Sequence, residues 1–301
     1  MSVASLLVDV LGPVVVLVAI GAVVGPRIGV EATSLSKLAY WILGPAFMFA
    51  SLYDAELDGD LIARLVAAAL AGMVVAGGIA WLVLRVTGAD YGERGAAALT
   101  SSYGNVGNAG LAICAFALGD DILPIASVLM LTINSAGLVF GTGIAAARTT
   151  TPLAALGRAV TAPMAVAAWL AIVANATNVS LPLIAERPVT LVASALIPTM
   201  LITLGIQLVA NGLPTLDRAL SVSAVAKLAV APLVAGVVIG LLDVDGDPAA
   251  AVIIQSAMPP AVFCALLALE HDFETERVTS SVAASTLASI VTLPVVLALT
   301  T

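Results

Sequence analysis

The sequence predicts an all-α membrane protein that crosses the bilayer ten times. Of its 301 residues 61% are hydrophobic and only 10% are charged, and the mean hydropathy is +1.15. A soluble protein cannot bury that much apolar surface. Charged and turn residues divide the chain into apolar stretches of about 20 residues, the length of a transmembrane helix. The predicted spans are 5–25, 33–53, 61–86, 94–118, 122–147, 160–178, 186–209, 218–242, 248–270 and 276–299.

Basic residues predict how these spans are oriented. The connections after the odd-numbered spans hold eight of them: Arg27, Lys37, Arg85, Arg94, Arg148, Arg158, Arg218 and Arg277. The opposite side holds two, Arg64 and Arg187. Because basic residues stay on the cytoplasmic side, we expect a multi-pass protein of the cell membrane with both termini outside. Ten spans, an even number, agree with termini on one side.

The charge composition excludes some classes of partner. The net charge is −8, with acidic clusters at 54–60 (DAELDGD) and 243–247 (DVDGD). A salt-adapted surface, as in a halophile, is favoured over an acidic binding rim, and no nucleic-acid partner is expected. Cys114 and Cys264 lie far apart in apolar stretches, which predicts two small buried side chains and no metal site.

Proline and polar landmarks recur at a nearly constant distance and predict an internal repeat. The pairs are Pro13 and Pro163, Pro45 and Pro198, Asn105 and Pro259, and Asp120 and Asp272, at offsets of 150, 153, 154 and 152 residues. These offsets predict a five-helix unit used twice, over 1–148 and 149–301. Since five is odd, the second unit must be inverted across the membrane. Chance alignment of prolines is the alternative.

The fourth span contains groups that do not suit a membrane helix. Gly104, Gly107 and Gly110 weaken it, and the amides of Asn105 and Asn108 need partners away from water. A continuous helix with a small-residue face explains the glycines but not the asparagines. Irregular backbone at membrane depth occurs where it lines a cavity or is buried in protein, so we expect this helix to be broken.

The ninth span has a second interruption. Pro259 and Pro260 remove two backbone donors beside Gln255 and Ser256. Interrupted helices at matching places of two repeats predict a substrate site, where helix N-termini and amide side chains suit a carboxylate. Lys227, about nine residues into the eighth span, either helps to neutralise an anion or a buried acid, or extends to the interface.

Six segments carry a resemblance to a known family: LGPAFMFASL (43–52), YGNVGNAGLA (103–112), LITLGIQL (201–208), KLAVAPL (227–233), QSAMPPAV (255–262) and STLASIVTLP (285–294). With these segments in this order, the chain resembles the auxin efflux carrier family, within the wider bile acid, arsenite and riboflavin transporter group. The resemblance implies two inverted five-helix repeats in which helices 4 and 9 are broken and cross. It also implies a scaffold of helices 1, 2, 6 and 7 and a mobile transport domain of helices 3–5 and 8–10. One departure is Ala112, where the family commonly has proline.

We therefore expect a secondary transporter that moves a small organic anion by alternating access. The expected substrate-binding residues are Asn105, Asn108, Lys227, Gln255, Ser256, Pro259 and Pro260, with Gly104, Gly107 and Gly110 forming the crossover backbone. The alternative is a sodium- or proton-coupled ion antiporter or symporter of related fold. No cofactor is expected, coupling to Na⁺ or H⁺ stays open, and a homodimer is compatible with the sequence. An intramembrane enzyme is disfavoured because no nucleophile–base pair, HExxH or DDxxD motif is present.

Overall fold

The computed structural model describes residues 6–145, 152–210 and 214–301, and these residues form helices joined by short connections. The α-helices are α2 (Gly12–Val24), α3 (Ala32–Leu38), α4 (Gly44–Tyr53), α5 (Gly59–Val86), α6 (Tyr91–Ser102), α7 (Leu111–Leu118), α8 (Leu123–Ala145), α9 (Pro152–Val160), α10 (Pro163–Ala176), α11 (Leu183–Ser194), α12 (Leu196–Ala210), α13 (Arg218–Val225), α14 (Ala231–Leu241), α15 (Gly246–Ser256), α16 (Val262–Glu270) and α17 (Thr275–Thr300). Within these residues, four π-helical turns run directly into α-helices: η1 (Leu6–Leu11), η3 (Ala39–Leu43), η4 (Val106–Gly110) and η6 (Ala226–Val230). The turns η2 (Pro26–Ile28) and η5 (Asp120–Ile122) are 3₁₀ turns.

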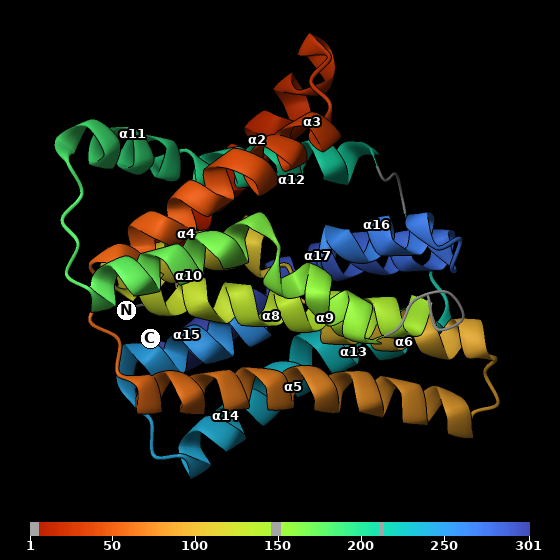
Figure 1. Cartoon of the computed structure of the whole chain (residues 1–301). Helices are drawn as coiled ribbons and strands as arrows, with labels where there is room; N and C mark the ends of the chain where they lie inside the picture. Colours follow the sequence, from red (N-terminus) through yellow and green to blue (C-terminus); the bar gives the residue numbers. More distant parts are fainter. Residues whose placement is uncertain (1–5, 146–151, 211–213) are drawn as a thin grey trace.

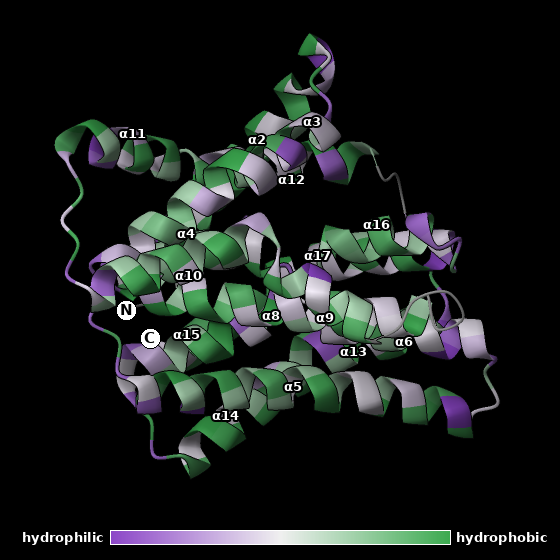
Figure 2. Ribbon diagram, viewed as in Figure 1, coloured by the Kyte–Doolittle hydropathy of each residue, from purple (hydrophilic) through white to green (hydrophobic). Residues whose placement is uncertain are grey.

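Within the described residues, seven continuous helical segments are long and apolar enough to cross a membrane. They are Val8–Ile28, Ala32–Tyr53, Gly59–Val86, Asp120–Ala145, Leu183–Ala210, Arg218–Leu241 and Thr275–Thr300. Leu153–Val160 and Pro163–Ala176, bent by 57°, form an eighth if they are one span. Figure 2 shows apolar residues along the long helices, with hydrophilic residues gathered toward the helix ends. The fold is that of a multi-pass helical membrane protein.

The predicted sixth span, 160–178, contains α10, the second helix of this bent pair, and leaves out nearly all of the first, α9. Ala162 has an extended ψ of 142°, and Pro163 begins α10. A residue before proline is disfavoured in the α-helical region, because the proline ring clashes with it. The preceding apolar residues therefore form a separate helix, α9. The predicted boundary between the two repeats, 148/149, and Arg148 lie outside the described residues.

Three of the π-helical turns precede prolines in the same register. Pro13, Pro45 and Pro232 are each the second residue of the α-helix that follows η1, η3 and η6. A proline inside a helix has no N–H, and its ring pushes away the carbonyl four residues earlier. A π turn widens the helix at that point and lets it continue. Of these prolines, Pro13 and Pro45 are landmarks of the predicted repeat.

The helices pack in two groups. In one group α2 packs on α12, and α4 packs on α10 and α11. In the other, α5 packs on α6 and α14, while α15 packs on α8 and α17. Figure 1 shows α2, α11 and α12 on one side of the molecule and α5 and α14 on the opposite side. Further contacts, including α4 with α8 and α12 with η4, join the groups.

Two glycines allow the close approach of α2 and α12. A Cβ atom at Gly21 would lie 2.0 Å from the carbonyl oxygen of Ile202. A Cβ atom at Gly205 would lie 1.9 Å from the carbonyl oxygen of Val18. Membrane helices associate through such small residues because van der Waals packing replaces the hydrophobic effect. The contact between these helices therefore depends on glycine in both.

We expect Gly205→Ala to destabilise the protein by about 1–3 kcal/mol, the usual cost of overpacking. The matched control is Gly78→Ala, an exposed position of α5 where a Cβ atom would meet nothing within 4 Å. There the substitution should be neutral or slightly stabilising, because alanine favours helix. Thermal unfolding of both variants in detergent tests this. Equal melting temperatures for the two variants would contradict the proposed role of Gly205.

A charged cluster ties together the first turns of α6, α13 and α17. Arg277 Nε donates to Asp217 Oδ2 at 2.8 Å, and Arg277 also pairs with Glu274. Glu93 lies 3.7 Å from Arg277 and 3.6 Å from Arg218. The other oxygen of Asp217 caps α13 by accepting from the N–H of Leu220 at 2.7 Å. Partial burial raises the pKa of Asp217, but the hydrogen bond from Arg277 and the bond from Leu220 outweigh it, so the pKa is lowered.

This lowered pKa predicts a pH dependence of stability. The Asp217 carboxylate stabilises the fold above its unfolded pKa, ordinarily 3.8, and this contribution is lost as the pH falls through the lower folded value. Asp217→Asn keeps an oxygen for the cap and removes the charge. We expect the variant to melt below the parent at pH 7 and the difference to shrink below about pH 4. A difference independent of pH would contradict this.

Candidate functional site

Two helices are interrupted as the sequence predicts. The first runs along α6 to Ser102, leaves helical geometry over Tyr103–Asn105, and resumes through η4 into α7. The second runs along α15 to Ser256 and resumes at Val262 in α16. The first interruption passes through Gly104, and the π turn that follows contains Gly107, Asn108 and Gly110. Ala112 follows this turn as the second residue of α7, the register that proline has after the other three π turns.

The two interruptions are hydrogen-bonded to each other. The N–H of Asn105 donates to the carbonyl of Pro259 at 2.7 Å, and the N–H of Ala261 donates to the carbonyl of Tyr103 at 2.8 Å. Gly104 and Pro260 face each other between these bonds as an isolated antiparallel pair. Irregular backbone at membrane depth must satisfy its polar groups within the protein. Each interruption does so through the other.

The prolines explain why the second helix ends at Ser256. In a continuous helix the N–H groups of residues 259 and 260 would donate to the carbonyls of Gln255 and Ser256. Proline has no N–H, so both donors are missing. The N–H of Met258 donates to the carbonyl of Gln255 instead, at 3.3 Å. The carbonyl of Ser256 accepts from Lys227 Nζ at 3.1 Å.

Lys227 lies inside the protein, with 3% of its surface exposed. Its side chain leaves η6 and turns toward the interruption, where a Cβ atom on Gly104 would lie 2.9 Å from Nζ. The alternative that Lys227 extends to the membrane interface is therefore wrong for this conformation. Among the described residues, Lys227 is the one charged side chain that is buried, and no carboxylate lies within ion-pair distance of it.

The predicted polar side chains lie in the same region, and several of their atoms lack partners within the described residues. Asn105, Asn108, Gln255 and Ser256 are all buried. Asn105 Nδ2, Gln255 Oε1 and Ser256 Oγ have no hydrogen-bond partner, whereas Gln255 Nε2 donates to the carbonyl of Ala126 at 2.9 Å. Buried polar atoms without partners are destabilising and mark a site where a ligand or water would satisfy them.

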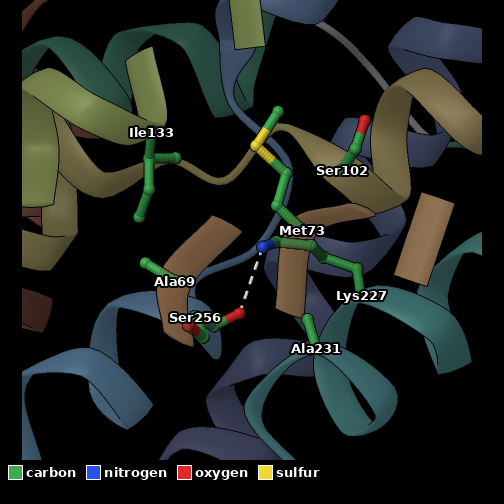
Figure 3. Close-up of a pocket in the computed structure, with 7 residues that line it drawn as sticks. All are labelled: Ala69, Met73, Ser102, Ile133, Lys227, Ala231 and Ser256. Atoms are coloured by element: carbon green, nitrogen blue, oxygen red, sulfur yellow. Dashed lines mark hydrogen bonds between the residues drawn. The ribbon is translucent and has the colours of Figure 1, made fainter. Parts of the chain in front are cut away.

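A small cavity adjoins the interruptions. It is lined by Ala69, Met73, Ser102, Ile133, Lys227, Ala231 and Ser256, and Figure 3 shows these side chains around the bond from Lys227 to Ser256. Its volume of about 10 Å³ is room for one water molecule. A carboxylate would need the surrounding helices to move. The site is closed in this conformation.

Sequence reasoning missed several residues of this region. Ser102 ends α6 and lines the cavity, and its place directly before the glycine-rich stretch could have indicated it. Met73 and Ala69 come from α5, whose apolar sequence carries no such signal. Tyr103 is 4% exposed, and its ring occupies the space where a side chain at Gly137 would be. Only the packing of α8 on this interruption shows that Tyr103 fills the space beside Gly137.

Together these features define a multi-pass helical membrane protein in which two interrupted helices meet in a buried polar region. Residues 149–297 match the family described as membrane transport protein. An uncharacterized transporter of Methanothermobacter thermautotrophicus is 28% identical over 274 residues, which cover 88% of this chain and 87% of that protein. Both similarities are to transporters rather than to enzymes, and they support a membrane transporter.

Proposed function

We propose that the protein is a carrier of the auxin efflux type that moves a small organic anion, a carboxylate, across the cell membrane. The observation that supports this most is the pairing of the two interruptions through Asn105 and Pro259, at 2.7 Å. In secondary transporters, discontinuous helices form the substrate site near the middle of the membrane. The ends of four half-helices then meet around one region.

The two interrupted helices would complete a set of ten spans. Among the described residues, seven continuous helices and one bent pair meet the criteria of length and apolarity for crossing a membrane. Neither 91–118 nor 246–270 is one continuous helix, but each has more than the roughly 20 residues that a span requires. Counted as spans, they bring the total to ten, with the two interruptions fourth and ninth.

The contacts support two related halves. The helices α2 and α12 belong to the first and seventh spans, whose counterparts in the other half are the sixth and second spans, with α10 and α4. The contact of α2 with α12 therefore has its counterpart in the contact of α10 with α4. Likewise the contact of α5 with α6 becomes that of α14 with α15, and the contact of α6 with α17 becomes that of α15 with α8. Each of these three contacts has its counterpart, as two halves related by a twofold axis require, and this supports the proposed repeat. We infer that the two packing groups are the scaffold and the transport domain.

An anionic substrate fits the charges of the site. The N-termini of α16 and of the η4–α7 segment begin at the interruptions, and helix N-termini carry about half a positive charge. Asn105 Nδ2 is a buried donor without a partner among the described residues. The buried polar residues of the described chain include no Asp or Glu, which cation exchangers use inside the membrane. These features favour an organic anion over a cation exchanger as the transported species.

Because the cavity is closed, transport requires movement. We propose alternating access, in which the group containing both interruptions moves against α2, α4, α10 and α12.

Reconstitution into proteoliposomes tests the function, with uptake of a panel of radiolabelled mono- and dicarboxylates under imposed voltage, pH or sodium gradients. We expect saturable uptake of at least one carboxylate. Alkali cation flux in the absence of any organic acid would support the ion-antiporter alternative instead.

A further inference from the structure

The buried ammonium group of Lys227 has a role that an anion site alone does not explain. It does not pair with a carboxylate of the described residues but donates to the backbone carbonyl of Ser256 at 3.1 Å. Ser256 is the last residue of α15, and Ser102, the last residue of α6, lines the same cavity. Two helix C-termini therefore converge beside one ammonium group.

Helix C-termini carry about half a negative charge each, and their last carbonyls lack partners within the helix. In crossover carriers such C-terminal ends and unwound carbonyls are where a coupling cation is coordinated. The carbonyl of Ser256 is of this kind because Pro260 cannot donate to it. Here Lys227 Nζ makes that contact.

Gly104 also favours the ammonium group at this position, because its lack of a side chain makes room for Lys227 Nζ. A Cβ atom at this position would lie 2.9 Å from Lys227 Nζ and 3.2 Å from Cε. The remaining cavity of about 10 Å³ holds a single water molecule. A hydrated sodium ion beside the ammonium group would not fit, and its positive charge would be repelled at this distance.

We propose that the Lys227 ammonium group is a covalently tethered cation, which holds the C-termini of α6 and α15 together and takes the place of a coupling cation between them. Lys227 is then a positioning residue for the paired interruptions, and transport by this protein needs no free sodium ion. This inference rests on the proposed carrier function.

The test compares acid uptake into proteoliposomes containing sodium or choline as the only added monovalent cation. We expect the parent protein to transport at the same rate, within about twofold, in both. Lys227→Ala should lose at least about tenfold in choline, because two partial negative charges are left uncompensated. Sodium or methylammonium ions should restore part of this loss, since the truncated side chain leaves space for them. Lys227→Met fills the space without a charge and should not be restored.

A binding measurement accompanies the flux assay and does not depend on the substrate. At constant ionic strength, exchanging choline for sodium or methylammonium should raise the melting temperature of Lys227→Ala and leave that of the parent unchanged. Lys37→Ala, which removes a lysine from the exposed face of α3, is the matched control and should behave like the parent. If Lys227→Ala does not fold, Gly104→Ala provides the second variant, since its added methyl group displaces Nζ, and it should slow uptake in both salts.

Three outcomes overturn the inference. One is uptake by the parent that falls at least tenfold when choline replaces sodium. Another is wild-type uptake in choline by Lys227→Ala and Lys227→Met, or by Gly104→Ala if neither lysine variant folds. The last is a folded Lys227→Ala that neither sodium nor methylammonium restores. Absence of acid uptake by the parent in either salt would instead reject the proposed function, and the melting measurements would still test the cation site.

Discussion

Replacing both Pro259 and Pro260 with alanine is expected to reduce acid uptake by at least about 100-fold while leaving the protein as stable as the parent, or more stable. Alanine restores the two N–H groups that Gln255 and Ser256 lack, and a proline in a helix interior is disfavoured by about 3 kcal/mol. We expect α15 to continue into α16. The bonds that join the interruptions, from Asn105 to Pro259 and from Ala261 to Tyr103, would then be lost.

Flux and thermal unfolding of the same purified sample test this prediction. The matched control is Pro294→Ala, which removes a proline from inside α17, away from the interruptions along the chain. It should alter stability without abolishing uptake. Parental uptake rates in the double variant would show that the interrupted geometry of the second helix is not required for transport.

Replacing Asn105 with alanine is expected to lower acid uptake by about 10- to 100-fold. Its side-chain amide is 4% exposed with Nδ2 unpartnered in the described structure, and a hydrogen bond to a charged group contributes about 1.5–3 kcal/mol. The backbone bond from Asn105 to Pro259 does not depend on the side chain, so the interruption should persist. Asn105→Asp, nearly the same size, should be at least as impaired, because its carboxylate repels an anion.

Asn134→Ala is the matched control for Asn105. Asn134 is a half-buried asparagine of α8 that takes no part in the hydrogen bonds joining the two interruptions, and its replacement should leave uptake within about twofold of the parent. Uptake rates and apparent affinities of the three variants distinguish the outcomes. If Asn105→Ala transports like the parent, the assignment of the substrate to the paired interruptions is wrong, even if the protein proves to be a carrier.

Much of the fold could be predicted because its causes are local. Apolar stretches long enough to span a bilayer, separated by charged residues, predict membrane helices, and the part of the chain that the structure describes contains seven continuous helices of this kind. Both predicted interruptions are also found, because glycine and proline act on the backbone within one turn. The bend before Pro163 has an equally local cause but was not predicted, since hydropathy does not register the residue before a proline.

The arrangement of the site was less predictable. Asn105 and Pro259 are 154 residues apart, and no local signal places them in one region. Their meeting was inferred from a repeat of landmarks, whose inversion stays a prediction, and from the resemblance to the auxin efflux carrier family. The direction in which the Lys227 side chain extends could not be inferred, because a lysine nine residues into a span can reach either the interface or the interior. Met73 and Ala69 carry no polar signal, and only their contact with the cavity assigns them to it.

The sequence by itself determined that this is a multi-pass helical membrane protein with one interruption around Asn105 and another at Pro259 and Pro260, because hydropathy, glycine and proline act through neighbouring residues. The tertiary structure decided that the two interruptions satisfy each other's backbone groups and that Lys227 supplies the donor that Pro260 lacks. It also decided that Gly21 and Gly205 allow one pair of helices to touch. Those contacts join residues more than a hundred positions apart or on different helices, and their geometry arises only when the helices pack.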